Sequence, residues 1–175
     1  MNKRLVLMLL LISVAFTQEA KDPFDLSSIM EKIDEIGVPT VESVANLETI
    51  ANELYNANKW EDAAEALNNF SKNANWLANL IKSGLDPYYG ASYDDRKEYP
   101  YKKIKPLIEY ESLTNEYIRK RNQAIIMEAE CYEKLGDNKK AVALYRKGLE
   151  LVNINNEVWW EKARLGLYNL IGLAK

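Results

Sequence analysis

The sequence predicts an all-α protein, and three observations carry that prediction. From residue 26 onward, apolar residues recur at intervals of three and four, the spacing that gathers them on one face of a helix. No run alternates between apolar and polar residues as a half-buried strand would. Every proline from Pro39 onward falls between the periodic segments, where helices begin or end.

Three helices are predicted in the first half of the chain, at 26–36, 40–57 and 60–83. Gly37 follows the first, because glycine adopts the left-handed conformation that ends a helix at no steric cost. Asn58 follows the second and tolerates the same conformation. In the third, inward residues step by four and three: Ala63, Leu67, Phe70, Ala74, Leu77 and Ile81.

A tyrosine-rich segment, 86–106, separates these helices from three more. Its prolines and glycine argue against a continuous element there. A proline suits the first helical turn, so the next helix is predicted over 106–135, straight or bent near the basic run at 119–121. Two shorter helices are predicted at about 138–152 and 157–174.

Residues 1–17 resemble a secretory signal peptide. Lys3 and Arg4 precede an apolar run at 5–16, which at 1.5 Å per residue spans about 18 Å, less than the ~30 Å hydrocarbon core of a bilayer. We therefore expect cleavage and export to the periplasm or the medium, with membrane contact only before cleavage. An uncleaved anchor is the alternative, and residues 18–175 are predicted to form a single domain.

Composition argues against several functions. The chain has 26 acidic and 23 basic residues, so nucleic acid is not expected as a partner. It has no histidine, the commonest general base and metal ligand, so no enzyme activity, metal or cofactor is predicted. Cys131, the single cysteine, is expected to be buried and inert. Acidic residues dominate 18–118 and basic residues 119–175, which leaves a homo-oligomer as an open alternative.

The segment AIIMEAECYEKLGDNKKAVALYRKGLEL, residues 124–151, resembles a tetratricopeptide repeat, a helix–turn–helix unit of about 34 residues. Ala129 and Ala141 are its small positions, which let two antiparallel helices approach closely. Gly136 and Asp137 form the turn. Further positions match the family: Tyr132, Tyr145 and Gly148.

A second, more divergent copy precedes it. Ala51 and Ala63 take the small positions, and Trp60 follows the turn. The repeat-like segments are then 44–77 and 122–155. An insert at 78–121 separates them, a capping helix at 157–174 follows, and Trp159 falls at the tryptophan position of the family.

In this family the first helices of successive repeats line a concave groove that holds a peptide. The resemblance therefore implies a non-catalytic scaffold for protein–protein interaction, an adaptor or assembly factor in the cell envelope. Trp160 and Arg164 lie four residues apart and would present a ring beside a cation, although Trp160 would alternatively only cap the core. The predicted groove residues are Glu48, Asn52, Tyr55, Gln123, Ile126, Glu130, Glu133, Trp160, Arg164 and Tyr168.

The tyrosines of the insert offer a second surface, since tyrosine combines a large contact area with a polar tip. One alternative function is therefore binding of a glycan or small ligand. The other interpretation, which we favour, is that the rings pack back onto the flanking helices and anchor the segment. The residues concerned are Tyr88, Tyr89, Tyr93, Tyr99 and Tyr101.

Overall fold

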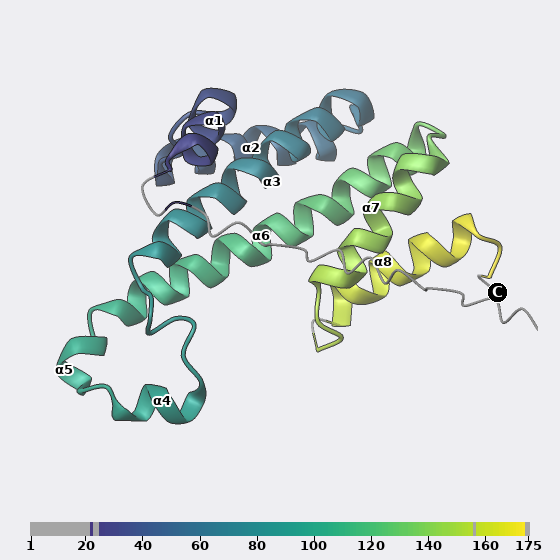
Figure 1. Cartoon of the computed structure of the whole chain (residues 1–175). Helices are drawn as coiled ribbons and strands as arrows, with labels where there is room; N and C mark the ends of the chain where they lie inside the picture. Colours follow the sequence, from purple (N-terminus) through teal and green to yellow (C-terminus); the bar gives the residue numbers. More distant parts are fainter. Residues whose placement is uncertain (1–21, 23–24, 156, 174–175) are drawn as a thin grey trace, which may run out of the picture. The chain divides into compact units, whose positions relative to one another are not determined.

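The computed structural model of the chain describes residues 22, 25–155 and 157–173. Within these ranges every regular element is a helix and no strand occurs, which confirms the predicted all-α class (Figure 1). The predicted signal peptide, residues 1–17, lies outside the described residues. Among the described residues no helix combines the length and hydropathy needed to cross a bilayer.

Contacts divide the chain into two compact units, residues 1–35 and 36–175, where the sequence predicts a single domain from residue 18. Helix α1, Ser27–Ile36, falls almost wholly in the first unit and buries none of its residues. Its apolar face is largely exposed: Ile29 and Met30, together with Leu26 just before the helix, are each accessible over more than two-fifths of their surface. The second unit holds all the remaining helices and is described by itself.

The helices of the second unit follow one another as neighbours. Helix α2 packs against α3, α3 against α6, α6 against α7 and α7 against α8, while α4 and α5 are short (Figure 1). The predicted pairing of helices into consecutive hairpins is therefore confirmed. Their bounds are α2 Val41–Asn56, α3 Trp60–Ser83, α4 Tyr93–Glu98, α5 Tyr101–Ile104, α6 Leu107–Lys134, α7 Asn138–Leu151 and α8 Glu157–Leu170.

Local sequence explains where the hairpin helices start and stop. Thr40 and Ser43 form a reciprocal capping box at the start of α2. Asn58 between α2 and α3, and Gly136 between α6 and α7, both have positive φ angles, 57° and 78°. After Gly136, the Asp137 carboxylate accepts a hydrogen bond from the third backbone N–H of α7. Both hairpin turns thus form as their residues predict.

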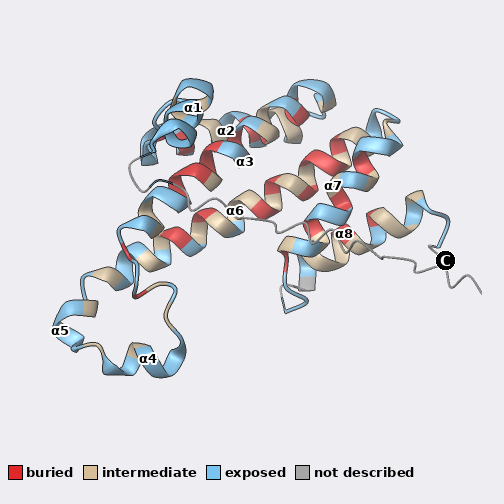
Figure 2. Ribbon diagram, viewed as in Figure 1, coloured by how far each residue is buried: buried red, intermediate tan, exposed pale blue. Residues whose placement is uncertain are grey.

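Alanines occupy the crossing points of both hairpins. Ala51 of α2 and Ala63 of α3 are fully buried in one core cluster. Ala129 of α6 and Ala141 of α7 are fully buried in a second cluster, which Ala163 of α8 completes. Figure 2 shows this burial as bands along the inner sides of α3, α6 and α7. Small side chains let the helices approach closely and let larger neighbours fill the space beside them.

Two glycines make room for large side chains in the second cluster. A Cβ on Gly148 of α7 would lie 2.7 Å from Cγ1 of Ile126, and a Cβ on Gly166 of α8 would overlap the Tyr145 ring. Ile126 is fully buried as a result. Its predicted role in a partner-binding groove is therefore wrong, because the close approach of α7 turns that position of α6 into core.

The predicted insert, 78–121, is mostly helix. Helix α3 continues to Ser83, and α6 runs without interruption from Leu107. The two extensions pack on each other: Ala78 and Tyr117 belong to the same core cluster, and Ile81 packs against it. Only residues 84–106 lie beyond this long hairpin, and they carry α4 and α5 at its end (Figure 1).

Candidate functional site

A cavity of about 240 Å³ brings together side chains from α2, α3, α6 and α8. Its floor is apolar, formed by Leu67 and Phe70 of α3 with Ala124 and Met127 of α6. Its rim is polar and aromatic, and the rim residues belong to α2, α6 and α8. These are the three helices that the resemblance described above implies to line a groove. We call this site the groove cavity; its rim consists of Glu48, Asn52, Lys120, Gln123 and Trp159.

Charges on the rim are paired. Lys120 of α6 donates to Glu48 of α2 at 2.8 Å and to Glu116, one turn away on α6, at 2.9 Å. Burial alone would lower the pKa of Lys120, but these two carboxylates raise it above its ordinary value. The ammonium group therefore stays charged and joins α2 to α6 at one side of the cavity.

Two amides on the rim have no hydrogen-bond partner of their own within the described residues: Asn52 of α2 and Gln123 of α6. Each offers a carbonyl acceptor and an NH₂ donor, the complement of a peptide bond. An apolar floor between two such amides can accept an apolar side chain while the rim binds the backbone that carries it.

A second polar cluster lies one turn further along the same helices. Tyr55 Oη of α2 donates to Glu130 Oε2 of α6 at 2.5 Å, and Lys162 Nζ of α8 lies 2.7 Å from the same oxygen. The ammonium group of Lys162 also lies 5.0 Å from the centre of the Trp159 ring. Burial, followed by the hydrogen bond to Glu130, raises the pKa of Tyr55 well above its usual range, so the phenol remains protonated. This cluster ties α2, α6 and α8 together.

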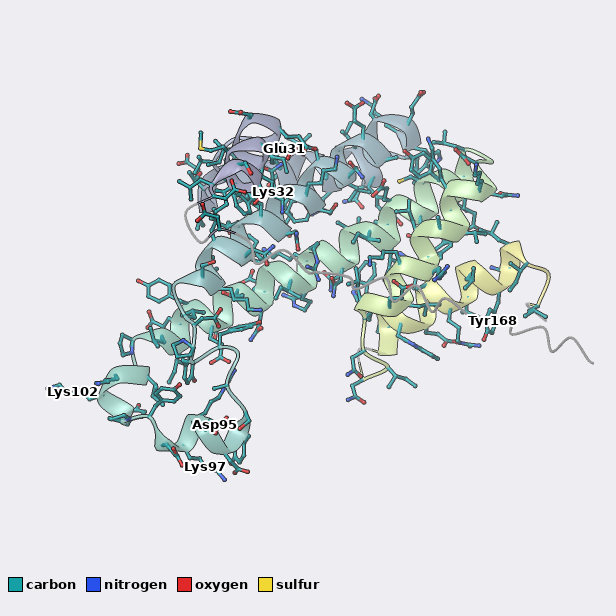
Figure 3. All side chains as sticks on the ribbon, viewed as in Figure 1. Glu31, Lys32, Asp95, Lys97, Lys102 and Tyr168 are labelled. Atoms are coloured by element: carbon teal, nitrogen blue, oxygen red, sulfur yellow. The ribbon has the colours of Figure 1, made fainter. Side chains whose placement is uncertain are left out.

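The other predicted groove residues have different surroundings. Glu133 accepts a hydrogen bond from the buried Tyr145 hydroxyl at 2.6 Å, a contact that joins α6 to α7. Arg164 pairs with Glu161 and has the rings of Trp160 and Tyr168 at 5.6 and 5.2 Å (Figure 3, where Tyr168 is labelled). None of these four predicted residues lines the groove cavity.

The neighbouring tryptophan, Trp159, lines the cavity instead of Trp160. Trp160 borders a separate hollow together with Ile154 and Asn155. Sequence reasoning also missed Lys120 and Lys162. Lys162 is a single lysine on a polar helix face, and Lys120 belongs to the basic run at 119–121, so neither position indicated a groove. Trp159 did have a signal, because it falls at the tryptophan position that the resemblance implies.

The tyrosine-rich segment is anchored to α6. Tyr88 is buried and its hydroxyl donates to Glu111 at 3.1 Å, while the Tyr99 ring meets it edge-on at 6.1 Å. Arg96 lies over the Tyr88 ring and pairs with Glu111 at 2.7 Å. Tyr89 donates to a side chain of α6 as well. The favoured interpretation, that the rings hold the segment down, agrees with these contacts for three of the five tyrosines.

The remaining two tyrosines face solvent. Tyr93 is 76% exposed and Tyr101 is 66% exposed. Lys97 lies 4.2 Å from the centre of the Tyr93 ring. Figure 3 shows Lys97 and Lys102 pointing outward from this end of the hairpin. The segment also lines a hollow of about 790 Å³, which includes Asp86, Asp95 and Tyr99 but neither of these two exposed rings.

Two titratable side chains of α6 lie buried in the core. Cys131 is fully buried, and burial raises the pKa of its thiol to about 12, so the thiolate is scarce at neutral pH. The buried carboxyl of Glu128 accepts hydrogen bonds from Asn68 at 3.2 and 3.4 Å and faces the α3–α6 core. Among the described residues no group of three or more acidic or cysteine side chains is placed to hold a metal ion.

No family model matches this chain, and no curated protein or solved structure matches it.

Proposed function

We propose that this protein is a non-catalytic scaffold that binds an extended segment of another protein in the groove cavity. One observation carries the proposal: side chains from α2, α6 and α8 surround a single apolar floor. The two hairpins, α2–α3 and α6–α7, are proposed to be divergent tetratricopeptide-like repeats, with α8 as the cap. This arrangement supports a peptide ligand because that family binds peptides on the same set of helices.

The size of the cavity favours one side chain of a large partner over a whole small molecule. Its 240 Å³ lies below the ~300–1,000 Å³ of typical small-molecule pockets. The apolar floor supplies affinity for an apolar side chain, and the amides of Asn52 and Gln123 would bind the adjoining peptide groups. Lys120 and Glu48 neutralise each other, so the bound peptide would contact the uncharged part of the rim.

We propose the cell envelope as the place of action, on the strength of residues 1–17 alone. Amino-terminal sequencing of the protein from its native host checks this part. A first residue between Phe16 and Lys21 is the expected result, and an intact Met1 would contradict cleavage.

A photo-crosslinking amino acid tests the groove directly. Placed at position 52, it should capture a partner that mass spectrometry identifies, whereas at position 46, an exposed residue of the same helix, it should not. Crosslinks to a protein from positions 93 and 101 in place of 52 would move the site to the tyrosine-rich segment and refute the groove.

Binding of the identified partner to purified protein then measures the role of the amides. The Asn52→Ala, Gln123→Ala double variant loses two hydrogen bonds worth about 1 kcal/mol each, so its affinity should fall roughly 30-fold. The matched control, Asn46→Ala with Asn79→Ala, removes two exposed amides of α2 and α3 and should bind as the wild type does. Equal affinity for both double variants would refute the groove.

A further inference from the structure

A second cavity, of about 350 Å³, lies on a different face of α6, between α3, α6 and α7. It shares no lining residue with the groove cavity. Three of its seven lining residues are cations, Lys72, Arg121 and Lys147, and none is acidic. Ile125 and Leu151 supply an apolar wall.

Arg121 is the central feature of this cavity. Its guanidinium group is half-buried, and no carboxylate among the described residues forms an ion pair with it. Burial lowers its pKa below the ordinary arginine value, in keeping with a charge that lacks a counter-ion. A buried charge is normally paired, because removing it from water is costly.

Neutral amides hold this guanidinium in place. Nε and Nη2 donate to Asn122 Oδ1 at 2.9 and 2.8 Å, and Nη1 donates to Asn75 Oδ1 at 2.5 Å. Asn122 is itself buried and donates to the carbonyl of Leu151 at the end of α7 at 2.8 Å. The group is thus fixed by three helices before any ligand arrives, so little ordering is needed on binding.

The held guanidinium still has donors to offer. Of its five N–H groups three are used, which leaves one on each terminal nitrogen. Lys147 is held only weakly, at 3.4 Å from Glu150 and with more than half of its side chain exposed, so its ammonium group can turn to the cavity. Two N–H groups on neighbouring nitrogens match the paired oxygens of a carboxylate or phosphate.

We propose that this cavity binds an organic oxyanion with a short aliphatic body. The oxyanion takes the two remaining N–H groups of Arg121 and the charge of Lys147, and the aliphatic part lies against Ile125 and Leu151. A cavity of this size falls at the lower end of the range for small-molecule sites, so the ligand is compact.

Two probes test the proposal: butyl phosphate carries a phosphate and pentanoate carries a carboxylate. Calorimetry and thermal unfolding of the purified chain in low-salt buffer measure their binding. Saturable binding of at least one is expected, with a rise in Tm of roughly 4 °C at ten times Kd. Inorganic phosphate should bind more weakly and butan-1-ol should not bind. Absence of saturable binding of both anions, or equal binding of butan-1-ol, would overturn the proposal.

A charge-matched pair of variants locates the site. Arg121→Gln should weaken binding of the tighter anion about 10- to 100-fold, because a charge-assisted two-point contact is lost. Arg119→Gln removes the same charge from an exposed position two residues away and should change affinity less than about twofold. Far-UV circular dichroism verifies that both variants are folded. Equal losses of anion affinity in the two variants would show that only the general surface charge matters and would refute the site at Arg121.

A measurement on the wild type is independent of the variants. The Asn75 and Asn122 side-chain amides contact Arg121, so the anion should shift their NMR signals in a saturable way. Shifts confined to the rim of the groove cavity, at Asn52 and Gln123, would place the anion elsewhere and refute the assignment.

Discussion

Replacing Glu128 by glutamine tests the energetics of the α3–α6 interface in one step. Glu128 is only 4% exposed. Burial raises the pKa of Glu128 from 4.5 to about 7, although the hydrogen bond from Asn68 and nearby lysines oppose the shift.

Because of this pKa shift, the free energy of unfolding depends on pH. The folded state binds the Glu128 proton more tightly than the unfolded state, so stability is highest below about pH 4.5 and falls as pH rises to 7. A difference of 2.5 between the two pKa values corresponds to about 3 kcal/mol lost above pH 7. At pH 5 the same relation gives a loss of less than about 1 kcal/mol.

Glu128→Gln retains the shape of the side chain and a hydrogen bond to Asn68 but carries no charge. It should therefore raise the free energy of unfolding by about 3 kcal/mol at pH 8 and by less than about 1 kcal/mol at pH 5. Urea unfolding followed by circular dichroism at both pH values measures this. Glu53→Gln, at an exposed position of α2, is the control and should change neither value. A loss of stability at pH 8, or the same gain at both pH values, would refute the reasoning.

Three further predictions concern packing, the tyrosine-rich segment and the thiol. Gly166→Ala gains about 1 kcal/mol of helix propensity but forces the Tyr145 ring to move, so urea unfolding should show a net loss of about 1–2 kcal/mol; a gain would contradict the overlap. Arg96→Gln breaks the ion pair with Glu111, so proteolysis within residues 84–106 should accelerate while the circular dichroism of the helices is unchanged. Cys131 should resist a thiol reagent in the native protein and react fully in urea; prompt native reaction would contradict its burial.

Much of the scaffold was predictable because it depends on short-range patterns. Asn58 and Gly136 end helices in the left-handed conformation that their types favour, and both turns came out as predicted. Ala51 and Ala129 marked the crossing points, because only a small side chain allows that approach. The exposed face of α1, in contrast, follows from no feature that the sequence analysis recognised.

The candidate site was predictable only in part. Glu48, Asn52 and Gln123 line the groove cavity as predicted, but Ile126 is core and Trp159 replaces its neighbour Trp160. One residue along a helix turns a side chain by about 100°, and periodicity locates a helix face no more finely than that.

The helices of this chain, their turns and their pairing into hairpins follow from the sequence, since these properties reside in neighbouring residues. Which side chains share a cavity and which charges lack a partner follow instead from the packing of helices that are distant in the chain. Arg121 illustrates the difference: in the sequence it is one member of a basic run, and its missing counter-ion becomes visible only when α3 and α7 close around it. Burial and pairing depend on residues that are dozens of positions apart, and no local pattern records them.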